Sequence, residues 1–184
     1  MRQQRGYTLL ELVVVTSIVA VLAAVALPGS NPPEYEKLEL AAARVAEALR
    51  FARTESIRTG QVHAVEVMLD TEQVIVSTAD MTQDSPYPAG IPTDPLSILY
   101  DPVALQRYEF NLSQGSTRGV DVLSQPFTYA IGDRRAVLFD AQGTPFHKGM
   151  GALNRLDDGA VELALGANRI DVRLDPLTGR VTIE

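Results

Sequence analysis

The sequence predicts an α+β fold in which one long helix packs on an antiparallel β-sheet. Two patterns indicate this: apolar residues recur at helical spacing between residues 34 and 59, and apolar and polar residues alternate in several short runs after residue 60. The apolar stripe of such a helix and the apolar faces of such strands both need covering, and packing one on the other covers both. A separate, almost wholly apolar run at residues 7–27 precedes this head.

The apolar run is long enough to cross a membrane. Its one charged side chain is Glu11, and a helix over residues 7–27 would be about 31 Å long, close to the thickness of a bilayer's hydrocarbon core. Arg2 and Arg5 precede it and favour a cytoplasmic N-terminus. We therefore expect a basic leader at residues 1–6, a single transmembrane helix at 7–27, and a head at 28–184 on the far side of the membrane.

Two other interpretations of this N-terminus remain open. An ordinary secretory signal peptide would be cut after Ala24-Val25-Ala26, but Glu11 is unusual in the apolar region of such a peptide and Pro28 would hinder cleavage. A plain signal anchor explains the hydrophobicity and leaves Glu11 without a role. A carboxylate in the bilayer costs on the order of 2.5–3.5 kcal/mol, so Glu11 is expected to be paired or functional.

The head is expected to begin with the helix at residues 34–59. The prolines of PGSNPP, residues 28–33, lack amide donors and should kink or interrupt the preceding helix. Gly60 stands where a C-terminal cap belongs. The arginines and glutamates on the other helix faces are expected to form a solvated surface, with contacts to a partner as the alternative. The apolar stripe consists of Leu38, Ala42, Val45, Leu49 and Ala52.

Strands are expected through the rest of the head, over about 62–184. Residues 62–78 predict a hairpin, with His63, Val65 and Val67 on its apolar side, and a third strand is plausible at 105–110. Turn sequences separate the later alternating runs, which predicts an antiparallel meander in the C-terminal third. These turns are DAQGTP at 140–145, GANR at 166–169 and DPLTGR at 175–180.

Composition excludes several classes of function. The chain has no cysteine, which rules out disulfides, c-type haem attachment and thiolate metal sites. Its net charge is −7, and loss of the leader would make it more acidic, so a protein that mainly coats nucleic acid or anionic lipid is disfavoured. A local basic patch remains compatible with this charge.

Catalytic and metal sites find little support. The only histidines are His63, on a predicted strand, and His147, in a turn-like stretch, and no nucleophile elbow is present. The acidic tripeptide Asp157-Asp158-Gly159 lacks the six to eight oxygens that Ca²⁺ takes, and we interpret it as a turn before a strand at 160–165. We therefore expect no enzymatic activity, no cofactor and no metal.

The sequence RGYTLLELVVV resembles the class III signal of type IV prepilins and type II secretion pseudopilins. The resemblance implies that a prepilin peptidase cuts between Gly6 and Tyr7 and that Tyr7 becomes N-methylated. Tyr7 stands where the family usually has phenylalanine. Glu11 then takes the place of the family's glutamate at the fifth mature position, and Pro28 that of the proline at the twenty-second. Cleavage also creates an amine one helical turn from Glu11, and an amine from a neighbouring copy would serve equally well as its partner.

Three head motifs resemble the GspH/FimT group of minor pseudopilins and minor pilins. They are LRFARTESIRTGQVHAVEV, FDAQGTP and DPLTGRVTIE. The resemblance implies a pilin-like fold, a place in the bacterial inner membrane and then in a filament, and other pilins or pseudopilins as partners. A type II secretion pseudopilin is favoured, a minor type IV pilin in pilus assembly or DNA uptake is the alternative, and a membrane-tethered enzyme is a remote third. Residues 79–126 match no motif, and the proline-rich part at 79–104 is either a partner surface or a variable loop.

DNA is a candidate partner through the C-terminus. FimT-like pilins that bind DNA have a Gly-Arg-x-Arg motif, which Gly179 and Arg180 begin and Thr182 breaks. Three arginines on the polar faces of the last strands would offer phosphate contacts: Arg169, Arg173 and Arg180. Acidic residues share those faces, so ion pairing between strands explains the same arginines without a ligand, and we favour that explanation. The acidic residues are Glu162, Asp171 and Glu184.

Overall fold

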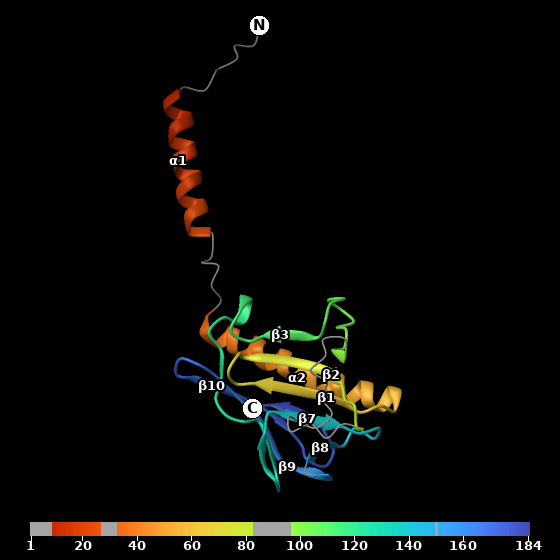
Figure 1. Cartoon of the computed structure of the whole chain (residues 1–184). Helices are drawn as coiled ribbons and strands as arrows, with labels where there is room; N and C mark the ends of the chain where they lie inside the picture. Colours follow the sequence, from red (N-terminus) through yellow and green to blue (C-terminus); the bar gives the residue numbers. More distant parts are fainter. Residues whose placement is uncertain (1–8, 27–32, 83–96, 150) are drawn as a thin grey trace. The chain divides into compact units, whose positions relative to one another are not determined.

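The structure is a computed structural model that describes residues 9–26, 33–82, 97–149 and 151–184 (Figure 1). The chain divides into two compact units, residues 1–32 and 33–184. The described part of the first unit is one helix, α1 (Leu9–Ala26). Among the described residues, no helix is long and apolar enough to cross a membrane. The predicted span at 7–27 and the interruption at 28–33 fall partly outside these residues, and both stay predictions.

Helix α2 (Glu34–Thr59) has the bounds that the sequence predicted. Gly60 ends it in the left-handed conformation, with φ 70°, and its amide donates to the Ser56 carbonyl at 2.9 Å. The expected apolar stripe is buried, and small residues beside it are buried too, so that the helix backbone approaches the sheet closely. These additional buried residues are Ala41, Ala46 and Ala48.

The predicted hairpin is confirmed. Strand β1 (His63–Met68) pairs antiparallel with β2 (Gln73–Thr78), with Val65 opposite Val76. The third strand, expected at 105–110, is a short β3 (Glu109–Asn111) that pairs with β2. The predicted start of this strand was wrong. The Asp101 carboxylate accepts hydrogen bonds from the amides of Val103 and Ala104, which makes a turn, and Leu105 follows with a φ of 53°.

The C-terminal meander is also confirmed. Strands β7 (Ala136–Phe139), β8 (Pro145–Gly149), β9 (Ala152–Leu165), β10 (Asn168–Leu174) and β11 (Val181–Ile183) each pair antiparallel with the next. Because β1 pairs with β7, the sheet has the order β11-β10-β9-β8-β7-β1-β2-β3. The turn sequences predicted to separate the meander strands all do so.

The turn predicted at Asp157-Asp158-Gly159 is wrong, since these residues lie inside the long strand β9. Their neighbour is β5 (Phe127–Tyr129), which pairs with β9 at Leu156, Asp158 and Gly159 across a register shift. Gly159 fits there because a Cβ would lie only 3.1 Å from the Leu174 carbonyl oxygen. The paired neighbours therefore hold a turn-like sequence in an extended strand.

Three short elements complete the described head. The 3₁₀ turn η2 (Gly115–Thr117) leads to β4 (Asp121–Val122), which pairs with β9, and β6 (Gly132–Arg134) forms a hairpin with β5. Much of this part falls in the 79–126 region that matched no motif.

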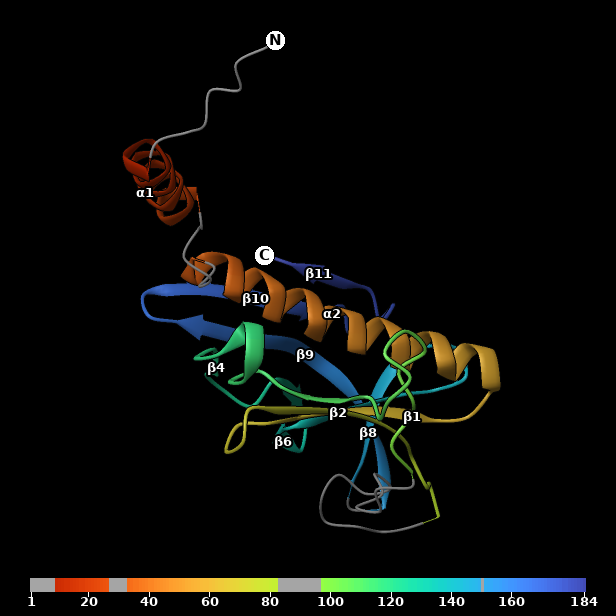
Figure 2. The same ribbon diagram turned by 90° about the horizontal axis from the view of Figure 1, so that it is seen from above.

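The main core lies between α2 and the sheet, and Figure 2 shows the helix running over the strands. A second, smaller cluster covers the opposite face, where Ala64, Ala136 and Leu138 are buried, so β1 and β7 are covered on both sides. Glu66 lies on the face that we expected to be polar, yet only 6% of it is exposed. It forms an ion pair with Arg135 at 2.5 Å. Burial raises the pKa of Glu66 and the Arg135 charge opposes that rise.

Candidate functional site

Helix α1 offers an apolar surface with one acidic residue. The side chains of residues 9–19 are all exposed, and Glu11 lies in the first turn. The hydroxyls of Thr16 and Ser17 donate to carbonyls one turn back, Leu12 at 2.9 Å and Val13 at 2.7 Å. Such internal bonds satisfy hydroxyls that enter an apolar environment. The surface is thus suited to contact with lipid or with other apolar helices.

Three of the predicted site residues cannot be placed on this structure. Gly6 and Tyr7, at the expected cleavage site, and Pro28, at the expected helix interruption, lie outside the described residues. Glu11 is the one member of the processing and assembly set that the structure describes.

The three C-terminal arginines do not converge on one site. Arg173 is surrounded by carboxylates, at 3.1 Å from Glu184, 3.7 Å from Asp171 and 3.8 Å from Asp158. The contact with Glu184, beside β11, confirms the predicted pairing between strands for Arg173. Asp171 lies on the same strand as Arg173, and Asp158 on β9 is an additional member. Arg169 lines a different groove, beside Tyr35 and Glu39 at the start of α2.

Arg180 lies between two grooves of opposite character. On one side it shares a groove of about 470 Å³ with Arg173 and three carboxylates, those of Asp158, Asp175 and Glu184. On the other side it shares a groove of about 620 Å³ with Arg50 and Arg53 of α2. Arg180 thus shares one groove with Arg173 and another with Arg50 and Arg53, and Arg169 lines neither of them.

Arg53 joins the three motifs on which the head's resemblance rests. Arg53 itself belongs to the motif LRFARTESIRTGQVHAVEV. Its Nε lies 3.2 Å from the carbonyl oxygen of Gly143, in FDAQGTP, and 3.1 Å from the carbonyl oxygen of Thr178, in DPLTGRVTIE. Arg50, one turn earlier, donates to the Val181 carbonyl at 3.0 Å. We call these contacts the Arg53 junction. The sequence suggested a solvated surface, or contacts to a partner, for both arginines, because no local pattern indicates that two distant turns meet there.

Both turns at the junction have the same internal design. The Asp140 carboxylate accepts from the amide of Thr144 at 2.8 Å, and the Asp175 carboxylate accepts from the amide of Thr178 at 2.7 Å. This amide is the main cause that lowers the pKa of Asp175. Each turn then places a glycine at positive φ, 78° at Gly143 and 66° at Gly179. The turns are therefore rigid and bring their carbonyls to Arg53.

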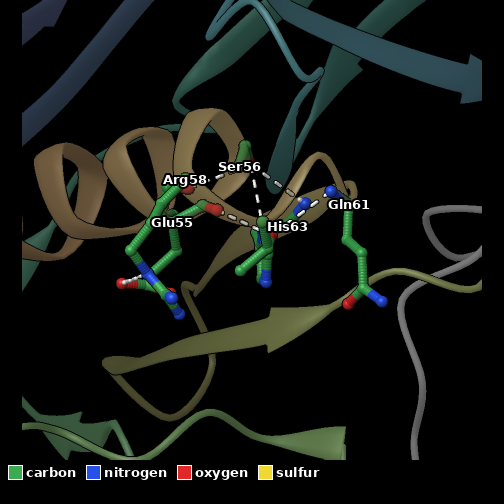
Figure 3. A network of polar contacts seen from close by, with 7 residues as sticks. Glu55, Ser56, Arg58, Gln61 and His63 are labelled. Atoms are coloured by element: carbon green, nitrogen blue, oxygen red, sulfur yellow. Dashed lines mark hydrogen bonds and ion pairs between the residues drawn. The ribbon is translucent and has the colours of Figure 1, made fainter.

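The two histidines are buried structural residues. Figure 3 shows His63 beneath the end of α2, where its backbone amide and Nδ1 each lie 3.2 Å from the Ser56 hydroxyl oxygen. That hydroxyl donates to the Ala52 carbonyl, and Ser56 has no exposed surface, so it is not placed to attack a substrate. Nearby, a hydrogen bond from Arg58 lowers the pKa of Glu55.

His147 packs edge-on against Tyr129, with ring centroids 5.2 Å apart. Burial lowers the pKa of both histidines, which favours their neutral forms. Neither ring nitrogen of His147 has a hydrogen-bond partner among the described residues. Within the same residues, no group of three acidic or histidine side chains is arranged to hold a metal ion.

Known proteins resemble this chain in its N-terminal segment and in its fold. Residues 1–27 match the model of the prokaryotic N-terminal methylation motif. No curated protein sequence matches the chain significantly.

The fold is similar to that of two solved bacterial proteins. The type IV minor pilin FimU of Pseudomonas aeruginosa is 12% identical, with a TM-score of 0.50, over 82% of this chain and 90% of FimU. The minor pseudopilin EpsH from the Type 2 Secretion System of Vibrio cholerae is 12% identical, with a TM-score of 0.51, over 80% of this chain and 96% of EpsH. The chain thus combines the N-terminal methylation motif of prepilins with a head that has the fold of minor pilins and minor pseudopilins.

Proposed function

We propose that this chain is a minor pseudopilin of a type II secretion system. It is a structural subunit of the periplasmic pseudopilus or of its tip, supports protein secretion, and has no enzymatic activity of its own. The observation that supports this most strongly is one chain with a methylation motif at residues 1–27 and a pilin-like head. EpsH, with which the head shares its fold, is a minor pseudopilin from the Type 2 Secretion System of Vibrio cholerae.

The proposal includes a path of maturation. The chain enters the inner membrane through residues 7–27, with its N-terminus in the cytoplasm and its head in the periplasm. A prepilin peptidase then cuts between Gly6 and Tyr7, and the new N-terminus is methylated. The methylation motif covers this whole segment, which supports both steps.

Assembly would proceed through α1. The apolar surface of this helix leaves the lipid and packs against the helices of other pilins or pseudopilins. Glu11 sets the axial register, because a carboxylate between apolar helices is stabilised best at the position where it meets an amine. Its own new N-terminus or that of a neighbour supplies this amine.

A minor type IV pilin, acting in pilus assembly or DNA uptake, is the second candidate. The similarity to FimU has almost the same TM-score as that to EpsH, so the fold favours neither system. The acidic surroundings of Arg173 weaken a DNA role. If DNA is nevertheless the ligand, the purified protein will retard it in a salt-dependent manner, and Arg180→Ala will abolish this retardation.

The experiment that separates the two systems compares exported proteins. Culture medium and periplasm are analysed from wild-type cells and from cells that lack this chain. Retention of normally secreted proteins in the periplasm of the mutant supports the pseudopilin. An unchanged secretome contradicts it and favours the pilus, where the matching measurements are surface pili and DNA uptake.

A further inference from the structure

The groove beside the Arg53 junction is a concentrated positive site on an acidic chain. It lies between α2 and the last turn, has a volume of about 620 Å³, and includes the side chains of Arg50, Arg53 and Arg180. Among the residues that the structure describes, no carboxylate lines it, whereas the whole chain has a net charge of −7. The remaining lining residues are Thr54, Thr178, Gly179 and Val181.

Two of the three arginines of this groove are held in place, and all three keep donors to spare. Arg50 uses one terminal nitrogen for the Val181 carbonyl, and Arg53 uses its Nε for the two turn carbonyls. Carbonyl oxygens orient a guanidinium without neutralising its charge, and each guanidinium has five N–H donors. Among the described residues, the Arg180 guanidinium makes no hydrogen bond or ion pair, although its charge contributes to the lowered pKa of Asp175. Arg50 and Arg53 are thus preorganised for an anion, and Arg180 adds a third positive charge that no described carboxylate pairs.

The surroundings select the kind of anion. The neighbouring groove across Arg180 contains the carboxylates of Asp158, Asp175 and Glu184. An extended polyanion such as DNA would have to pass these charges, which repel it. A short acidic segment with one or two carboxylates fits within the arginine groove alone, where planar guanidiniums bind carboxylates through paired hydrogen bonds.

We propose that the groove formed by Arg50, Arg53 and Arg180 binds the carboxylates of an acidic segment on a neighbouring protein subunit. This rests on the proposed function, in which the chain is one member of an assembly. The groove then fixes which neighbour the head accepts, because charge complementarity contributes more to partner choice than to affinity.

The test uses the full chain in detergent micelles and a fluorescein-labelled hexaglutamate peptide at low salt. Binding is followed by fluorescence anisotropy, with a hexaglutamine peptide and a labelled DNA duplex as parallel probes. Arg180→Glu is the informative variant, and Arg180→Gln is a milder second variant. Arg118→Glu is the matched control, because it makes the same change of net charge at an exposed arginine outside the groove. Circular dichroism checks that each variant is folded.

We expect hexaglutamate to bind and hexaglutamine not to bind. Arg180→Glu should weaken the binding of hexaglutamate roughly tenfold or more, because it removes charged hydrogen bonds and adds a repulsion. Arg118→Glu should change the affinity by much less. Absence of hexaglutamate binding, or equal losses in the two charge-reversal variants, overturns the proposal. DNA binding that depends on Arg180, without hexaglutamate binding, overturns it in favour of nucleic acid. None of these results depends on processing or secretion, so a failure here leaves the proposed function to its own test.

Discussion

Replacing Gly179 with alanine is expected to destabilise the head strongly, although it adds only one methyl group. Gly179 has a φ of 66°, where an L-residue costs about 1–2 kcal/mol. A Cβ would also overlap the Gly143 carbonyl oxygen and lie 2.9 Å from Arg53 Nε. Overpacking of this kind costs about 1–3 kcal/mol, because two backbone turns would have to separate. The total loss is therefore about 2–5 kcal/mol.

Gly60→Ala is the matched control for this variant. Gly60 has almost the same φ, 70°, but a Cβ there would meet no atom within 4 Å, so only the cost of about 1–2 kcal/mol for the backbone conformation applies. Thermal unfolding of the purified protein, followed by circular dichroism of the sheet, measures both. At about 2–4 °C per kcal/mol, Gly179→Ala should lower Tm by roughly 4–20 °C and Gly60→Ala by roughly 2–8 °C. Equal losses would refute the close packing of the two turns.

Three further outcomes are expected. Glu11→Leu should enter the membrane normally but fail to join filaments, because an apolar side chain sets no axial register; fractionation and isolation of filaments measure both, and normal incorporation would contradict the role of Glu11. Gly6→Val should block processing, so a product of mature length on a denaturing gel would refute the cleavage site. Burial lowers the pKa of His147, so below about pH 6.5 this histidine binds a proton more readily in the unfolded chain than in the folded one. The free energy of unfolding should therefore fall as the pH drops through that value. His147→Phe removes the group and should make urea unfolding midpoints depend less on pH between about 7 and 5; an unchanged dependence would show that His147 does not contribute.

The elements that could be predicted from the sequence are those with a local signal. Helix α2 was predicted with its bounds because its stripe is regular and Gly60 ends it. The strands of the meander followed from alternation between turn sequences that contain glycine. The missed features depend on residues far apart in the chain. Glu66 is buried because Arg135 lies beside it, and 157–159 is extended because β5 pairs with it.

The candidate sites also divide into those with a local sequence signal and those that depend on residues far apart in the chain. The N-terminal motif is local and was recognised from its residues, and the methylation model matches the same segment. The arginine groove could not be predicted, because Arg50 and Arg180 come together only when the last turn returns to α2. The pairing of Arg173 with Glu184 was predicted because Glu184 follows the adjacent strand β11, and Asp171 is two residues away on β10 itself.

The Arg53 junction also fixes the order in which the head can be completed. Arg53 lies 90 residues before Gly143 and 125 residues before Thr178, so its contacts close some of the longest loops in the chain. In the proposed path, in which the chain enters the periplasm from its N-terminal end, Arg53 arrives early and the last turn arrives near the very end. Helix α2 therefore makes its last contacts only when almost the whole head has emerged. A chain that ends before Thr178 lacks the hydrogen bond from Arg53 to the Thr178 carbonyl.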